Sequence, residues 1–277
     1  MKDKISYLCM LLVAKKEKNS SMSDETKAVS QSDWYVKNPD KDIEIEAMGQ
    51  KFNRFPIHTH YVQPGKDNYI DLVKKYVLPV YREGDIVSVS EKVISICEGR
   101  VVYKKDVKVS GIARFLSKFV HGDVVVGLHL AIPEKMQVAI DQVGVPRILL
   151  AAACAAVTRP FGKHGVFYKV AGRQAAGVDG FESDGFQDYL DMAILCPADS
   201  EKVCSEVLEK TGVRMMIVDA NDLGVEILGA AKTIPYSTEE LASLIRDNPS
   251  CQEAECTPFV LIRKADASEK EAVASAS

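Results

Sequence analysis

The sequence lacks a long apolar run, and it lacks a large excess of charge of either sign. Its longest apolar stretch near the N-terminus covers residues 5–14, which is shorter than the roughly 20 residues of a membrane-spanning helix. Charged residues 15–18 follow it where a signal peptide would have a small-residue cleavage site. The 35 Lys and Arg against 39 Asp and Glu leave a net charge of −4, so the overall charge gives no reason to bind nucleic acid or an anionic membrane. We therefore expect a cytoplasmic protein with neither partner.

The sequence also lacks the cysteine pattern of a disulfide framework or a zinc site. Its seven cysteines are an odd number in a chain of 277 residues, whereas disulfide-stabilised secreted domains are usually shorter and richer in cysteine. Cys251 and Cys256 lie close together, but no second pair or neighbouring His completes a zinc site. We expect all seven thiols to be reduced.

Three common catalytic motifs are missing as well. The chain contains no GxSxG nucleophile turn, no HExxH zinc helix and no GxxxxGK[ST] phosphate loop. These absences argue against serine hydrolases of that type, against zinc proteases and against P-loop enzymes. A nucleotide site, if the chain has one, must be built in another way.

The composition is that of a folded protein with polar ends. Hydrophobic residues make up 47% and charged residues 27% of the chain, close to the average for globular proteins. Residues 1–45 are expected to form a poorly packed tail, residues 46–265 a folded domain, and residues 266–277, which are small and charged, a disordered end.

Strand and helix patterns alternate along the folded part, which predicts a mixed α/β (α+β) fold. Strands are predicted at residues 85–90, 123–132, 166–170, 192–196, 213–218 and 259–263, and helices at residues 67–80, 112–120, 146–157, 200–210 and 237–246. Ser237 and Glu240 form a capping-box pattern at the last helix, and Ser200 stands at the start of another. Residues 148–157 are apolar all round, which predicts a central buried helix.

The richest polar cluster follows the predicted strand at residues 213–218. It contains Asp219, Asn221 and Asp222 in a turn with Gly224. Such oxygen side chains suit Mg²⁺ or Mn²⁺, but an Asx turn that only reverses the chain uses the same residues and is the commoner case. Both interpretations stay open at this point, and a calcium-loop interpretation fails because Glu226 comes too early for an EF-hand.

A second cluster is the glycine-rich segment 172–180, which contains Arg173 and Asp179. Backbone amides of such a loop can approach a phosphate, and an Asp among them can hold the counter-cation. A surface turn is an equally good interpretation of the glycines.

A third stretch, residues 59–68, joins a predicted strand to a helix whose N-terminal amides could take an anion. His58 and His60 share one face at strand spacing, but two histidines without a third ligand are more often simple polar residues than a metal site. Lys92, after the strand at 85–90, is a candidate phosphate contact, although lysines are mostly solvated.

In combination, four segments are similar to the coenzyme F420-0:γ-glutamyl ligase family. They read GDIVSVSEKVISICEGRVV (84–102), AAGVDG (175–180), MIVDANDLGVEILG (216–229) and NPSCQEAECTPFVLIR (248–263). The resemblance covers about residues 56–263. It implies a γ-glutamyl ligase-like fold of two interleaved subdomains, unrelated to P-loop enzymes, a homodimer, and a dependence on GTP and on Mn²⁺ or Mg²⁺.

The resemblance also implies roles for individual residues. Asp179 and Asp219 match the family's metal aspartates, and Gln252 matches a glutamine that contacts metal and nucleotide. The remaining matches fall where the family contacts the guanine nucleotide, at Thr59, His60, Tyr61, Val62, Glu91 and Lys92.

Several positions depart from the family pattern. Ala220 stands where the family has Ser or Thr, Ile96 replaces a nucleotide-contacting Lys, and Glu182 replaces an Asn. Asn221 or Asp222 would then supply the missing oxygen ligand. These changes favour a divergent subgroup. The resemblance implies a deazaflavin acceptor of the coenzyme F420-0 type, and a reduced folate is the alternative.

The expected reaction is amide ligation. Phosphoryl transfer from GTP activates a carboxylate acceptor, and the amine of L-glutamate then displaces phosphate, with the metal neutralising triphosphate charge. We expect Arg173 to contact the acceptor carboxylate and Asp222 to assist. A non-catalytic nucleotide-binding module is the rival prediction, favoured by Ala220 and Ile96 but opposed by the acidic pair Asp179 and Asp219.

Overall fold

The structure, a computed structural model, describes residues 34–119, 130–163, 165–181, 190–221, 224–251 and 255–265. The chain divides into two units, residues 1–33 and residues 34–277, and the first of these lies outside the described residues. Within the second unit, Trp34 and Tyr35 pack against Phe55 with ring centroids about 5 Å apart, so packed structure begins earlier than residue 46.

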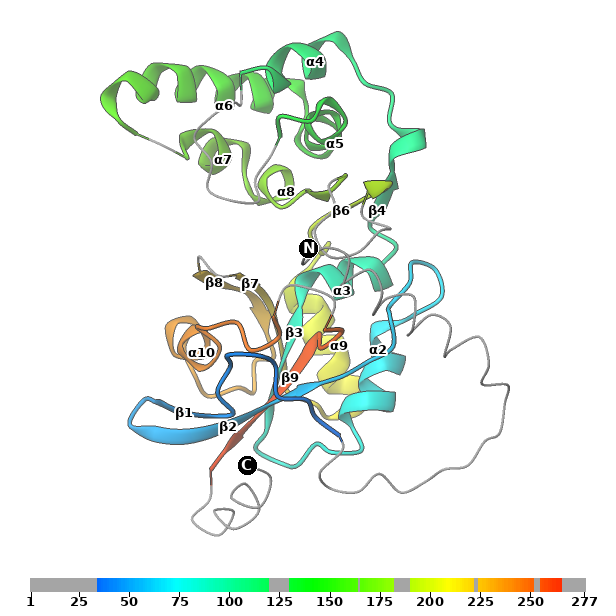
Figure 1. Ribbon diagram of the computed structural model, residues 1–277, viewed down its shortest axis with the longest axis vertical. Helices are drawn as coiled ribbons and strands as arrows, with labels where there is room; N and C mark the ends of the chain where they lie inside the picture. Colours follow the sequence, from blue (N-terminus) through cyan, green and yellow to red (C-terminus); the bar gives the residue numbers. More distant parts are fainter. Residues whose placement is uncertain are drawn as a thin grey trace, which may run out of the picture. The chain divides into compact units, whose positions relative to one another are not determined.

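A six-stranded mixed sheet forms the centre of one part of this unit (Figure 1). The strand order is β1-β2-β9-β3-β7-β8. Strands β3 and β7 are parallel, and the other neighbouring pairs are antiparallel. The strands span Glu44–Ala47 (β1), Gln50–Ile57 (β2), Ile86–Ser90 (β3), Met215–Asn221 (β7), Gly224–Ala230 (β8) and Phe259–Lys264 (β9).

Alternating side chains bury both faces of this sheet. Phe259 and Leu261 of β9 belong to a core shared with α2 (Tyr69–Leu72), its continuation η1 (Val73–Val77) and α9 (Ser200–Thr211). Val260 and Ile262 point to a second core under α10 (Thr238–Leu244). The two-residue period of a strand explains this division, and helices cover the sheet on both sides.

A third hydrophobic core lies among helices inserted between β4 and β6. It is bordered by a small sheet of order β4-β6-β5. The elements are β4 (Val101–Tyr103), η2 (Lys104–Asp106), α4 (Gly111–Ser117), α5 (Pro133–Val143), α6 (Val145–Thr158), η3 (Arg159–Phe161), α7 (Val166–Ala171), α8 (Arg173–Ala176), β5 (Asp179–Gly180) and β6 (Met192–Ile194).

The mixed α/β class predicted from the sequence is confirmed. Strands β3, β6, β7 and β9 and helices α2, α4, α6, α9 and α10 lie where the patterns placed them. The Ser237–Glu240 capping box is present, whereas α9 is capped by Asp199, whose side chain accepts a hydrogen bond from the Lys202 amide. The strand predicted at residues 123–132 lies mostly outside the described residues, and residues 130–132 form a turn and bend.

Two predictions are wrong. Residues 166–170 form helix α7 and not a strand, because Gly165 and Gly172 at positive φ bound the segment and its aromatic residues pack into the helical core. The helix at 146–157 exists, but it is not centrally buried. Within α6 only Ile148 and Ala151 are buried among the residues described.

By length and apolarity, no described helix qualifies alone as a membrane span. Among the described helices, only Pro133–Val143 and Val145–Phe161 taken together are long and apolar enough, and these two segments are bent by 115° relative to each other.

Candidate functional site

Arg173 brings together three carboxylates from three other elements. Its Nη2 donates to Asp219 Oδ2 at 2.9 Å and to Glu91 Oε2 at 3.1 Å, and its Nη1 donates to Glu226 Oε2. Arg173 opens the short helix α8, Glu91 opens α3 (Glu91–Cys97), and the other two acids lie on β7 and β8. A guanidinium has a planar fork of donors and suits such multiple carboxylate contacts.

Glu91 is the buried centre of this group, with 2% of its surface exposed. Lys92 Nζ lies 2.9 Å from its Oε1, while Arg173 holds its Oε2. The contact with Lys92 is a close ion pair between two groups that are both largely buried. One buried carboxylate therefore positions both cations of the site.

Lys92 connects this group to the segment that carries Asp179. Its Nζ donates to the Gly177 carbonyl at 3.0 Å and lies 3.9 Å from Asp179 Oδ2. Asp179 Oδ1 accepts a hydrogen bond from the Gly180 amide at 2.9 Å. We call Glu91, Lys92, Arg173, Asp179, Asp219 and Glu226 the acid–base cluster.

The topology explains why distant residues meet here. Strands β3 and β7 are neighbours and parallel, with Ser90 opposite Val218. Glu91 follows β3 directly, and Asp219 lies two residues before the end of β7, so both lie near the carboxyl ends of these strands. Carboxyl ends of adjacent parallel strands are a common location of binding sites in α/β folds.

The local structure around Asp219 differs from the prediction. Strand β7 continues through Asn221, and Asp219 pairs across the hairpin with Glu226 of β8. Two like charges directly opposite each other destabilise a strand pair, and Arg173 offsets this by binding both. The segment 172–180 is likewise not a loop after a strand, since it contains α8 and the start of β5.

Charge interactions dominate the titration of the two cations. Burial alone lowers the pKa of Lys92, but the negative charges of Glu91 and Asp179 outweigh it and raise that pKa. Burial likewise lowers the pKa of Arg173, and the charges of Glu91 and Glu226 reverse this. Both side chains are therefore firmly cationic at neutral pH.

The cluster suits a divalent cation in charge and in donor type. Four carboxylates and two cations give a net charge of about −2, and carboxylate oxygens are the ligands that Mg²⁺ and Mn²⁺ prefer. As the described side chains stand, no three His, Cys, Asp or Glu residues form a group that could hold a metal, since Lys92 and Arg173 already hold the acids.

Other predicted site residues lie in a different environment. Thr59 is buried, and its hydroxyl donates to the His60 carbonyl at 2.9 Å. His60 Nδ1 lies 2.6 Å from the Tyr76 hydroxyl and its Nε2 lies 2.8 Å from Asp67 Oδ1. Val62 is buried in the core, and Tyr61 is partly buried.

Two predicted residues lie outside the described part of the chain, namely Asp222 and Gln252. Asn221 is described by its backbone alone, as the β7 residue opposite Gly224. Their predicted roles in metal or nucleotide binding therefore stay predictions.

Reasoning from the sequence misses Glu226 as a member of the site. From the sequence, Glu226 is considered only as a calcium-loop ligand and is rejected. It nevertheless lies seven residues after Asp219, in a stretch where apolar and polar residues alternate as they do in a strand. A hairpin prediction over residues 215–230 would have placed the two acids opposite each other.

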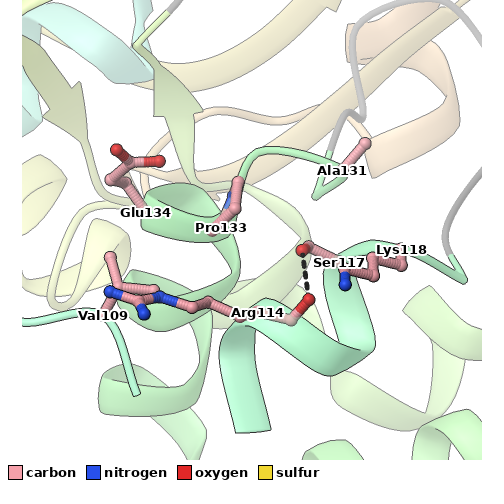
Figure 2. A pocket seen from close by; sticks show the side chains of 7 residues that line it. All are labelled: Val109, Arg114, Ser117, Lys118, Ala131, Pro133 and Glu134. Atoms are coloured by element: carbon pink, nitrogen blue, oxygen red, sulfur yellow. Dashed lines mark hydrogen bonds between the residues drawn. The ribbon is translucent and has the colours of Figure 1, made fainter. Parts of the chain in front are cut away.

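A separate cavity of about 430 Å³ lies between α4 and the start of α5 (Figure 2). The Ser117 hydroxyl donates to the Arg114 carbonyl beside it. The cavity is lined by Val109, Arg114, Ser117, Lys118, Ala131, Pro133 and Glu134, so it shares no residue with the acid–base cluster.

Comparison with known proteins adds no assignment. No family model matches the chain, and no curated protein matches it in sequence.

Proposed function

We propose that this protein is a GTP- and divalent-metal-dependent ligase that joins L-glutamate through an amide bond to a carboxylate acceptor. The observation that carries the proposal is the acid–base cluster. It unites Glu91, Lys92, Arg173, Asp179 and Asp219, five residues that the family resemblance and the motifs select from the sequence alone.

The cluster has the groups that such a reaction needs. Asp179 and Asp219 would hold a Mg²⁺ or Mn²⁺ ion, which supplies charge neutralisation for the triphosphate when bound. Lys92 would contact a phosphate, and Arg173 would orient the acceptor carboxylate, since a guanidinium binds carboxylates in a fixed geometry. Glu91 keeps both cations in place from its buried position.

In this arrangement Arg173 is engaged by protein carboxylates. For Arg173 to reach the acceptor, its contacts with Asp219 and Glu226 must open. Occupation of Asp219 by a divalent cation would free the guanidinium, so binding of the metal nucleotide would precede productive binding of the acceptor.

The proposed ligation proceeds in two steps. The acceptor carboxylate attacks the γ-phosphorus of GTP, which releases GDP and forms an acyl phosphate. The amine of glutamate then attacks the acyl carbon, which releases phosphate and one proton and forms the amide. The acceptor is a deazaflavin of the coenzyme F420-0 type or, as the alternative, a reduced folate.

The variant Asp219→Asn tests the proposal against its rival. In a ligase it should abolish acceptor-dependent phosphate release from GTP in the presence of Mn²⁺ and L-glutamate, because the substitution removes the negative charge with which this side chain would hold the divalent cation. Asp71→Asn, an exposed aspartate on α2, is the matched control and should keep full activity. Tight GTP binding with no turnover by the wild type on any acceptor would favour the non-catalytic nucleotide-binding module.

A further inference from the structure

Residues 103–119, which include η2 and α4, carry a local excess of positive charge. Asp106 is the only acid among them, and the five cations are Lys104, Lys105, Lys108, Arg114 and Lys118. These residues therefore have a net charge of +4, whereas the whole chain has a net charge of −4. The overall balance conceals a strongly basic segment.

The same residues expose large apolar side chains. Ile112 is 41% exposed, Phe115 60% and Phe119 63%, and the two phenylalanine rings lie 4.8 Å apart between centroids. Residues three and four positions apart lie on one side of a helix, so these three side chains form one apolar ridge. We call residues 103–119 the basic–aromatic segment.

The core holds α4 from its other side. Ala113 and Leu116 are buried in the core of the helical part. The Ser110 side chain accepts a hydrogen bond from the Ala113 amide at 3.2 Å, and the Ser110 amide donates to Gln137 Oε1 of α5 at 3.0 Å. A packed and capped helix therefore presents the ridge and its neighbouring cations outward.

The five cations are available to a partner. All of them are exposed, and none forms an ion pair with another residue in the described part of the chain. Lys105 Nζ lies 5.6 Å from the centre of the Tyr103 ring. Arg114 and Lys118 also line the cavity beside α4, to which Glu134 contributes an acid (Figure 2). The described acids therefore leave most of this positive charge without a close counter-charge.

This combination has the chemistry of a surface that binds an anionic membrane. Such surfaces place aromatic and aliphatic side chains at the boundary of headgroups and acyl chains, and lysines and arginines beside them reach the lipid phosphates. A nucleic acid is the other common polyanion, but Ile112 offers no ring for a base to stack on. The hydroxyls of Ser110 and Ser117 are also already used, in the helix cap and in a hydrogen bond to the Arg114 carbonyl. The segment therefore favours lipid.

We propose that the basic–aromatic segment docks this protein on an anionic membrane surface. Ile112, Phe115 and Phe119 enter the boundary between headgroups and acyl chains, and the cations contact the phosphates of acidic lipids. The expectation drawn from the overall charge differs, because a membrane responds to the charge within a Debye length, about 8 Å at physiological salt. The docking is independent of the proposed ligase activity.

Co-sedimentation of the full chain with lipid vesicles tests the surface. The wild type should bind vesicles of phosphatidylcholine mixed with phosphatidylserine, and it should not bind vesicles of phosphatidylcholine alone. Raising the salt from about 0.1 M to about 1 M should release most of the bound protein, because the Debye length falls from about 10 Å to about 3 Å.

Two double variants separate this segment from the charge of the whole protein. Arg114→Gln combined with Lys118→Gln should weaken binding about 25-fold, at about fivefold for each charge removed. Lys74→Gln combined with Lys232→Gln removes the same charge at two exposed lysines outside the segment, and this matched control should bind as the wild type does. Circular dichroism checks that each variant is folded.

A tryptophan in the ridge tests insertion. The single native tryptophan, Trp34, packs against Phe55 with ring centroids 5.0 Å apart, and it serves as the reference. On vesicles that contain phosphatidylserine, the fluorescence of Phe115→Trp should shift to the blue and should be quenched by brominated acyl chains. The wild type should show neither change.

Four results would each overturn the proposal. They are equal binding of the wild type to both kinds of vesicle, equal losses of binding for the two double variants, and unchanged Phe115→Trp fluorescence on vesicles that bind the protein. The fourth is binding of a single-stranded RNA without binding to either kind of vesicle, which would assign the segment to nucleic acid instead.

Discussion

Neutralising Glu91 is the most informative single perturbation of the acid–base cluster. Glu91 is almost completely buried and faces Lys92 at 2.9 Å and Arg173 at 3.1 Å. In Glu91→Gln both cations lose their shared counter-charge, and the amide NH₂ group faces a cation on at least one side. Breaking a buried charge pair costs about 3–5 kcal/mol. Asp219 and Asp179 still face the two cations in this variant. We therefore expect a loss of unfolding free energy at the low end of this range, about 3 kcal/mol.

The thermal midpoint should therefore fall by about 6–12 °C, at about 2–4 °C per kcal/mol for a chain of this size. The matched control is Glu226→Gln, which removes a carboxylate from the same guanidinium at a residue whose side chain is 63% exposed. An exposed pair is worth less than about 1 kcal/mol, so its midpoint should barely move. Circular dichroism melts of both variants measure the difference. A loss below about 1 kcal/mol for Glu91→Gln, or equal losses for the two variants, would refute the central role of Glu91.

Three further predictions follow from the packing and the charges. Gly177→Ala should lower stability by about 1–3 kcal/mol in a thermal melt, because an added Cβ would lie 2.2 Å from Cys196 Sγ and 3.2 Å from the Arg173 carbonyl; an unchanged midpoint would contradict this. Cys196 should stay unlabelled by a thiol reagent at pH 8 in the native protein, because burial and the charge of Glu91 raise its pKa to about 11; rapid labelling seen by mass spectrometry would contradict it. Asp247→Asn should destabilise the protein at neutral pH by about 1–3 kcal/mol, because it removes the counter-charge of the buried Arg54. Although burial alone raises the pKa of Asp247, its hydrogen bond and ion pair with Arg54 lower it, so its stabilising effect is present above an unfolded-state pKa of about 3.9 and is lost as pH falls through the lower folded-state value. Urea unfolding of Asp247→Asn and wild type should therefore converge below about pH 4, and a gap that is independent of pH would contradict the argument.

Much of the fold is predictable because strand periodicity is a local property. Strands β3, β7 and β9 alternate apolar side chains toward two cores, or carry them continuously, and the patterns locate them within a few residues. The capping box of α10 is equally local, since the side chains of Ser237 and Glu240 each accept a hydrogen bond from the backbone amide of the other residue.

The wrong predictions concern features that depend on tertiary packing. Residues 166–170 are rich in β-branched and aromatic residues, yet they form α7 because flanking glycines and the packing of the helical core override strand propensity. The apolar sequence of α6 predicts burial, and the sequence carries no sign that one of its faces stays uncovered in a single chain. An exposed apolar face has the same composition as a buried one, so the sequence alone does not distinguish them.

The sequence predicts which residues belong to the candidate site, but it does not predict which of them contact one another. Local pattern or resemblance selects Asp179, Asp219, Lys92 and Arg173 one by one, but no sequence pattern indicates that Arg173 binds three carboxylates at once. That convergence depends on the parallel pairing of β3 with β7 and on the β7–β8 hairpin, which bring residues from distant parts of the chain to one edge of the sheet.

The proposed function assigns a nucleotide-driven ligation to the acid–base cluster. The most direct test is phosphate release from GTP by the purified wild-type protein with Mn²⁺ and L-glutamate, across acceptors that include the deazaflavin precursor and reduced folates. We expect release that depends on one acceptor, with a product heavier by one glutamate, and loss of that release in Asp219→Asn. Acceptor-dependent release that persists undiminished in Asp219→Asn, or the absence of release with every acceptor, would contradict it.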